Sequence, residues 1–271
     1  MIDFKLKNVN LLIIMFTDSH THLYLPEFED DLESVIANAM ESKVSRFLLP
    51  NIDQTTLPQL ITTCHKYKDI CFPMIGLHPC SVEANYIEQL EKLYTHIDNE
   101  PFIAIGEIGI DLYWEKKFIS QQKEAFIRQI ELSQKYNLPI VIHCRNAFNE
   151  IYDIIKRKEF ENITGVFHCF TGDYTQAKKI IDKGFLLGIG GIVTFKNSEL
   201  SDVVRKIDLE HIVLETDAPY LAPTPMRGKR NESKYISIIA EKISEIKNTT
   251  ITKISESTNH NINTLFFNKK I

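Results

Sequence analysis

Short apolar runs of strand length alternate along the chain with longer stretches in which apolar residues recur at helical spacing. This alternation is typical of repeated βα units built around a parallel sheet. Helices are predicted, among others, over 30–41, 120–136 and 174–183. Eight strands are predicted, at 15–19, 45–49, 71–77, 102–106, 139–143, 164–168, 185–189 and 211–215. Eight such units indicate an α/β fold, a TIM-type (β/α)₈ barrel whose active site lies at the carboxyl ends of the strands.

The domain organisation is expected to be simple. No repeat, low-complexity tract or linker divides the chain, so residues 15–271 are predicted to form one barrel domain. Residues 1–14 precede the patterned sequence and are interpreted as an N-terminal appendage, with Met15 as an alternative initiator. Residues 236–267 predict an eighth helix and a closing helix, with Phe266 and Phe267 packed on the barrel.

Composition narrows the class of protein. A chain of 271 residues with 44% hydrophobic content can bury one large core. Its net charge of -5 argues against a protein that coats nucleic acid, so any contact with DNA is expected to be local. The five cysteines form no CxxC pair, which favours a reduced, cytoplasmic protein. The apolar run 11–16 is too short for a membrane span and lacks a signal-cleavage pattern, so no membrane association is expected.

Candidate metal ligands begin at the end of the first predicted strand. His20 and His22 are two residues apart, so in an extended segment both imidazoles point to the same side and can reach one ion. An isolated pair of this kind is also compatible with two partly buried polar residues. Glu107 follows a predicted strand and has glycine on either side of its motif, which leaves room for a carboxylate that bridges two ions. The alternative for Glu107 is a solvated loop carboxylate.

Three further residues end predicted strands. His143 and His168 each follow a β-rich run, an unusual place for a residue whose burial requires a hydrogen-bond partner. A core histidine is the alternative for either one, but both together favour metal binding. Asp217 lies just past the eighth strand, where a carboxylate can hold a metal and accept a proton from its water. The sequence therefore predicts a site of six ligands at one end of the barrel.

These residues lie in segments that resemble the TatD-type metal-dependent deoxyribonucleases, a branch of the metallo-dependent hydrolase barrels. The resemblance extends from about Met15 to the end of the chain. It rests on DSHTHL at 18–23, GLHP at 76–79, GEIGID at 106–111, IHCR at 142–145, FHCFTG at 167–172 and LETDAPYL at 214–221.

The resemblance implies a role for each candidate ligand. His20 and His22 would bind one ion, and His143 and His168 the other. Glu107 would bridge the two ions, and Asp217 would complete the first site and act as the base. Because this chain has Glu107 where many related barrels carry a carboxylated lysine, the resemblance favours the TatD branch over dihydroorotase-like or urease-like amide hydrolases. Four imidazole ligands favour Zn or Mn over Mg, whereas availability favours Mg, so all three metals are candidates.

Charge favours a phosphate substrate. Two divalent ions bring four positive charges and the two predicted carboxylate ligands return only two, so the site stays net positive. Candidate phosphate contacts are His78, which matches a family position, Arg145, and the loop cations Arg227, Lys229 and Arg230. The alternative for the loop cations is a solvated loop. Tyr113 and Trp114 are candidates for stacking on a base, with a plain packing role as the alternative.

The functional hypothesis is a deoxyribonuclease of the 3'-5' exonuclease type. A metal-bound hydroxide would attack phosphorus, with Glu107 and Asp217 as the catalytic carboxylates. DNA ends or single strands would be the substrate, and no obligate protein partner is implied. The alternatives are a hydrolase of a small phosphoester, amide or lactone on the same site, or a metal-stabilised binding protein without turnover.

Overall fold

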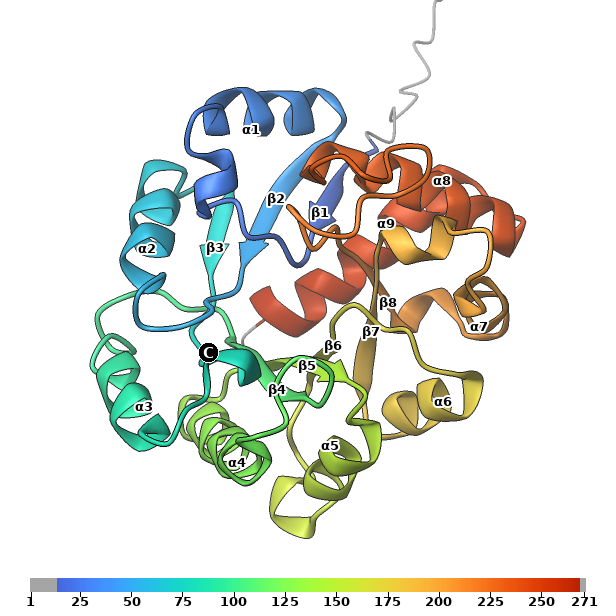
Figure 1. Ribbon diagram of the computed structural model, residues 1–271. Helices are drawn as coiled ribbons and strands as arrows, with labels where there is room; N and C mark the ends of the chain where they lie inside the picture. Colours follow the sequence, from blue (N-terminus) through green and yellow to red (C-terminus); the bar gives the residue numbers. More distant parts are fainter. Residues whose placement is uncertain (1–13, 269–271) are drawn as a thin grey trace, which may run out of the picture.

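The computed structural model describes residues 14–268. Within this range eight parallel strands form a central barrel and helices surround it (Figure 1), which confirms the predicted fold. The strands are β1 Phe16–Asp18, β2 Val44–Leu49, β3 Cys71–Pro73, β4 Ile105–Asp111, β5 Ile140–Arg145, β6 Gly165–Phe167, β7 Phe185–Ile189 and β8 Ile212–Leu214. Residues 1–13, most of the predicted appendage, lie outside the described range.

The sheet closes through contacts at two seams. Regular pairing runs in the order β1-β2-β3 and, separately, β4-β5-β6-β7-β8. A parallel bridge between Ile75 and Ile105 joins the two groups on one side. On the other side the amide of Ser19 donates to the carbonyl of Leu214 at 3.0 Å, which connects the first strand to the last. Closure removes exposed sheet edges and brings all the strand ends to one rim.

The helices lie outside the barrel (Figure 1). They turn apolar faces toward it. In α5, for example, Ile151, Ile154 and Ile155 are buried, at the spacing of one helical face. The predicted helices are present, with ends that differ by one or two residues. The α-helices are α1 Leu32–Glu41, α2 Leu57–Lys66, α3 Tyr86–Tyr94, α4 Ile119–Tyr136, α5 Phe148–Ile155, α6 Tyr174–Asp182, α7 Leu200–Lys206, α8 Ile236–Lys247 and α9 Ile251–Ile262.

The fourth strand differs from the prediction of 102–106. β4 begins at Ile105 and continues through Glu107 to Asp111, and its whole length is buried. In the sequence the glycines were interpreted as space for a bridging carboxylate after the strand. They instead allow close pairing with β5, since a Cβ built on Gly109 would lie 2.0 Å from the carbonyl oxygen of His143. Glu107 therefore lies inside a strand and not after one.

The third strand is also shorter than predicted. It ends at Pro73, and of the remaining predicted residues Ile75 makes only an isolated bridge. The apolar character of 74–77 reflects burial, because Met74, Ile75 and Leu77 are all buried without regular strand pairing. Burial and strand pairing are separate properties, and an apolar run reports only the first.

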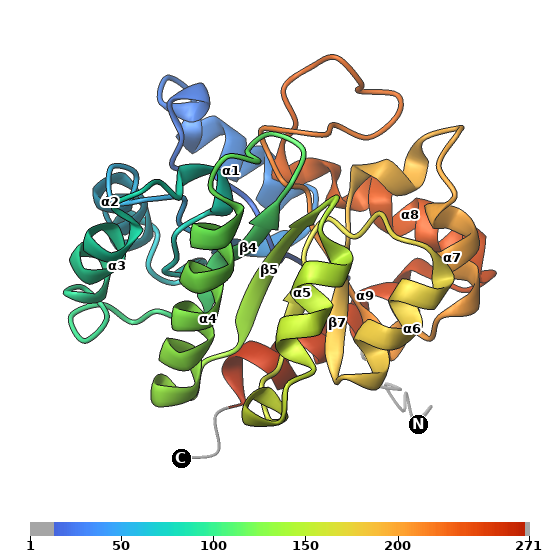
Figure 2. The ribbon, with the colours of Figure 1, turned by 60° about the horizontal axis from the view of Figure 1, so that its bottom comes forward.

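The closing helix seals the end of the barrel opposite to the strand tips. Figure 2 shows α9 near this end, away from the tips of β4 and β5. Phe266, in the π-helical turn that follows α9, is buried against strand residues such as Val141 and Val213. The ring of Phe267 lies 5.0 Å from that of Phe72. These contacts confirm the predicted packing of both phenylalanines. Among the described residues, we find no helix with the length and apolarity that a membrane crossing requires.

Candidate metal centre

His20 and His22 follow β1 directly and are both buried. The Nε2 atoms of His20 and His22 lie 3.8 and 3.6 Å from Oδ1 of Asp217, which follows β8. Asp217 has a left-handed φ of 58°, and its amide donates to the carbonyl of His20 at 2.9 Å. Asp tolerates this backbone region better than most residues. The loop after β8 thus turns the Asp217 carboxylate toward the two histidines.

Glu107 occupies the centre of the site and directs its two oxygens to different histidines. Oε2 lies 3.1 Å from Nε2 of His20 and 3.7 Å from Nε2 of His22. Oε1 lies 2.7 Å from Nδ1 of His143 and 2.8 Å from Nε2 of His168. The side chain is almost completely buried. One carboxylate thus has one oxygen in each of two donor groups.

These donor groups fit two metal ions. The first holds two imidazole nitrogens and oxygens of Asp217 and Glu107, and the second holds two imidazole nitrogens and the other oxygen of Glu107. Ligand atoms about 2.0–2.1 Å from a tetrahedral ion lie roughly 3.3 Å apart, close to the separations found here. Nitrogen and carboxylate donors in this ratio suit Zn or Mn. The structure therefore brings together all six predicted ligands in an arrangement that suits a shared carboxylate.

The histidines of the centre shift the pKa values of its two carboxylates. Burial acts to raise the pKa of Glu107, but the neighbouring His168, His78 and His20 lower it well below its usual value. Burial is also the largest influence on the pKa of Asp217, yet the contacts with His22, His168 and His20 lower it. Both carboxylates are therefore ionised in the folded protein, as metal ligands must be.

His78 lies at the edge of the centre, and a contact with the backbone fixes its tautomer. Its Nδ1 accepts a hydrogen bond from the amide of Cys80 at 3.0 Å. A neutral ring with an accepting Nδ1 carries its proton on Nε2. That Nε2 lies 3.3 Å from Oε1 of Glu107. It is therefore set up to donate a hydrogen bond to an oxygen, which is the property a phosphate contact needs.

Two further carboxylates, which were not predicted as site residues, lie next to predicted ligands. Oδ2 of Asp111 lies 3.0 Å from Nε2 of His143. With a proton on that nitrogen, Nδ1 of His143 is left free for an ion. Burial acts to raise the pKa of Asp111, but hydrogen bonds from His143 and from the amides of Trp114 and Tyr113 lower it. In the sequence, the aspartate at the end of the GEIGID motif was the feature that could have identified this residue.

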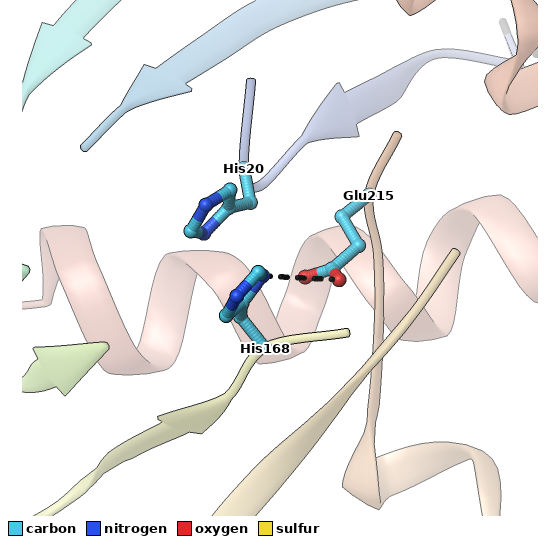
Figure 3. Close-up of side chains that lie close together, drawn as sticks. All are labelled: His20, His168 and Glu215. Carbon is cyan, nitrogen blue, oxygen red and sulfur yellow. Dashed lines mark ion pairs between the residues drawn. The ribbon is translucent and has the colours of Figure 1, made fainter. Parts of the chain in front are cut away.

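Glu215 has the same position behind His168. Figure 3 shows its carboxylate directed at the His168 ring from the segment after β8, with Oε1 3.6 Å from Nδ1. That distance is too long for a hydrogen bond, and Oε1 instead accepts the amide of Cys169. The rings of His20 and His168 stack with centroids 3.8 Å apart. Because Nε2 of His168 faces Glu107, the position of Glu215 is that of a support for the ring and not of a further ligand.

Asp18 connects the first and last strands beneath the site. Its oxygens accept hydrogen bonds from the amide and the hydroxyl of Thr216 at 2.9 and 2.6 Å. Complete burial raises the pKa of Asp18 to about 7. The DSHTHL motif thus contains a structural carboxylate as well as two candidate ligands.

A cavity of about 690 Å³ opens beside the candidate ligands at the carboxyl ends of the strands. It is lined by His22, Ile52, His78, Cys80, Ser81, Glu107, Asp111, Trp114, His143, Arg145, His168, Asp217, Tyr220 and Leu221. Of the five predicted phosphate contacts, His78 and Arg145 line this cavity. Arg145 is exposed, and no carboxylate among the described residues pairs with its guanidinium.

The remaining loop cations are placed differently from the prediction. Arg230 does not line the cavity, and its guanidinium makes two bonds to Asp31, at 2.9 and 2.7 Å. Arg230 was predicted to bind a phosphate, but it instead forms ion pairs with Asp31 and Glu232. Arg227 is exposed, with its guanidinium 4.2 Å from the centre of the Phe195 ring. Lys229 is also exposed outside the cavity lining.

A comparison with known families agrees with this geometry. The family model described as "TatD related DNase" matches residues 17–267 of this chain. This chain belongs to the TatD-related DNase family. The match covers all six candidate ligands, and it confirms the resemblance seen in the sequence.

Individual relatives of the TatD family extend the comparison. The chain is 38% identical over 253 residues to the metal-dependent hydrolase YabD of Bacillus subtilis, covering 93% of this chain and 99% of the relative. It is 33% identical over 261 residues to the metal-dependent hydrolase YcfH of Escherichia coli, covering 93% and 96%. The crystal structure of YjjV, a TatD homolog from Escherichia coli, superposes with a TM-score of 0.87 at 27% identity, covering 93% and 97%. The chain is therefore a metal-dependent hydrolase of the TatD family.

Proposed function

We propose that this TatD-family hydrolase is a deoxyribonuclease that shortens DNA from an end, with 3'-5' polarity. The observation that carries the proposal is the position of Arg145, an unpaired cation that lines the same cavity as Glu107, Asp217 and His78. An arginine free of carboxylates beside a cluster of candidate metal ligands is suited to a phosphate anion. The family description as a DNase supports the same substrate.

Each residue has a part in this reaction. His20, His22 and Asp217 would hold one divalent ion and His143 and His168 the other, with Glu107 shared, and the ions would supply Lewis-acid stabilisation of phosphate charge and a lowered pKa for the attacking water. The Asp217 carboxylate borders the cavity and would orient that water and accept its proton. Nε2–H of His78 would donate to a phosphate oxygen. Arg145 would bind the phosphate through two N–H groups.

The cations outside the cavity have a more distant role in this proposal. The segment between β8 and α8, orange in Figure 2, extends beyond the strand tips. Arg227 and Lys229 are exposed on this segment and would contact the DNA backbone away from the scissile bond. Such contacts strengthen binding without touching the reacting phosphate. All five cysteines are free, and we propose a cytoplasmic location on that basis.

The decisive experiment compares substrates. Protein loaded in turn with Zn, Mn or Mg is incubated with single-stranded DNA, duplex DNA, RNA, a phosphomonoester, and a panel of amides and lactones. We expect stepwise shortening of single-stranded DNA, with 5'-labelled strands giving ladders and 3'-labelled strands releasing the labelled nucleotide first. The matched controls are Asp217→Asn, which should lose the activity, and Asp69→Asn, at an exposed aspartate before β3. Turnover of amides or lactones without DNA cleavage under any metal would overturn the proposal.

A further inference from the structure

Exposed apolar side chains gather at the mouth of the candidate site. Seven large apolar side chains are exposed in the described part of the chain, and three of them, Trp114, Tyr220 and Leu221, line the cavity that holds the candidate ligands. Trp114 is 69% exposed. This exposure excludes the plain packing role considered for Trp114. An indole left in water beside a reactive centre is suited to bind a flat, partly apolar group.

The turn that carries Trp114 is held in place from within. Oδ1 of Asp111 accepts hydrogen bonds from the amides of Tyr113 and Trp114, each at 2.7 Å. The side chain of Gln122 in α4 in turn accepts the amide of Asp111 and donates to the carbonyl of Glu115. The turn is therefore ordered before any ligand arrives, which lowers the entropy lost on binding.

Asp111 also connects this turn to the candidate metal centre. While Oδ1 holds the two amides, Oδ2 contacts Nε2 of His143 at 3.0 Å. A single carboxylate thus positions both a candidate ligand and the backbone that carries the exposed indole. The backbone of Trp114 is in this way placed at a fixed location relative to His143.

The neighbours of Trp114 supply a cation at the same point. The rings of Tyr113 and Trp114 meet edge to face, 4.7 Å apart at 88°. The guanidinium of Arg145 lies 4.4 Å from the centre of the Tyr113 ring and 5.5 Å from that of Trp114. Cation–π contacts at these distances restrain the arginine without neutralising it. An aromatic face and a free cation side by side match a nucleobase and its own phosphate.

We propose that Trp114 is the stacking surface for an unpaired nucleobase adjoining the scissile phosphate, while Arg145 binds that phosphate. Tyr220, 47% exposed on the segment after β8, lines the same cavity and gives the base a second aromatic neighbour. Because a base inside a duplex stacks on its neighbours, this surface selects single strands and frayed ends. This inference rests on the proposed function and adds to it a subsite that binds unpaired bases by stacking.

The chain has one tryptophan, so its intrinsic fluorescence reports on Trp114 alone. Metal-loaded, full-length protein is titrated with a short oligothymidylate whose phosphorothioate linkages slow hydrolysis, and with an abasic oligomer of equal length and charge. We expect the oligothymidylate to quench the fluorescence and the abasic oligomer to leave it nearly unchanged. Equal quenching by the two oligomers would overturn the stacking role.

Substitutions test the same inference by anisotropy of labelled oligomers. The wild type should bind oligothymidylate more tightly than the abasic oligomer, and Trp114→Ala should reduce this preference by about 5- to 150-fold, the range for loss of one stacked base. Trp114→Phe should restore part of it. Tyr174→Ala, at an aromatic 41% exposed on α6 outside the cavity lining, is the matched control and should keep the preference.

The outcomes separate this inference from the proposed function. Cleavage of DNA by the wild type together with an unchanged base preference in folded Trp114→Ala would remove the stacking role and leave the deoxyribonuclease. Failure of the wild type to bind or cleave any DNA would overturn the proposed function and this inference with it. Circular dichroism confirms the fold of each variant.

Discussion

Gly188 leaves the space that Glu215 occupies. A Cβ built on Gly188 would lie 2.1 Å from Oε2 of Glu215, a separation that real structures do not tolerate. Glu215 is completely buried, and its other oxygen faces His168. Because Gly188 in β7 has no side chain, the Glu215 carboxylate fits beside it. From there it lies next to His168, a candidate ligand.

Replacement of this glycine should disturb the metal centre at a distance. We expect Gly188→Ala to displace Glu215, lower the melting temperature and weaken metal affinity or activity by about 10- to 100-fold, as loss of a ligand's supporting contact does. Gly190→Ala is the matched control, because a Cβ there would have its nearest contact at 3.5 Å. The measurements are metal content and turnover. Equal behaviour of the two variants would show that Glu215 does not support the centre.

Metal stoichiometry tests the role of Glu107. Because its two oxygens face two donor groups, we expect about two divalent ions per chain after reconstitution. Glu107→Gln removes the shared charge, so it should retain at most one ion. Glu161→Gln, at an exposed position, should bind like the wild type. Elemental analysis decides, and a wild type that saturates at one ion would refute the shared carboxylate.

Asp217 should matter for turnover more than for folding. Asp217→Asn keeps the shape of the side chain but removes both a ligand charge and a proton acceptor. We expect a loss in kcat of at least about 100-fold with a native circular dichroism spectrum. A near-native rate in the folded variant would remove Asp217 from the mechanism.

The two arginines that the sequence analysis treated alike should behave differently. Arg145→Ala should raise KM for DNA about 10-fold or more, since a hydrogen bond to a charged group is worth ~1.5–3 kcal/mol, and it should release no metal. Arg230→Ala should leave KM unchanged and lower the free energy of unfolding by only about 0.2–1 kcal/mol, because its ion pair with Asp31 is partly exposed. Steady-state kinetics and urea unfolding give both quantities. A large rise in KM for Arg230→Ala alone would reverse the assignment.

The sequence by itself determined the barrel and the six residues that meet at its rim. Alternating strand and helix periods limit the topology strongly, and in a parallel barrel every strand end reaches the same rim. Residues as distant in the chain as His20, His168 and Asp217 could therefore be placed together without coordinates. The same reasoning could not distinguish a residue after a strand from one inside it, as the shift of β4 around Glu107 shows.

Only the tertiary structure decided which side chains support the ligands and which cations face the cavity. Asp111 and Glu215 carry no periodic signal, since their contacts depend on side-chain direction and on the space left by Gly188. Arg145 and Arg230 look alike in sequence, yet one is free at the cavity and the other is neutralised by Asp31. The physical reason is that a charge interacts with whatever the fold brings within a few ångströms, and those neighbours come from other elements of the chain.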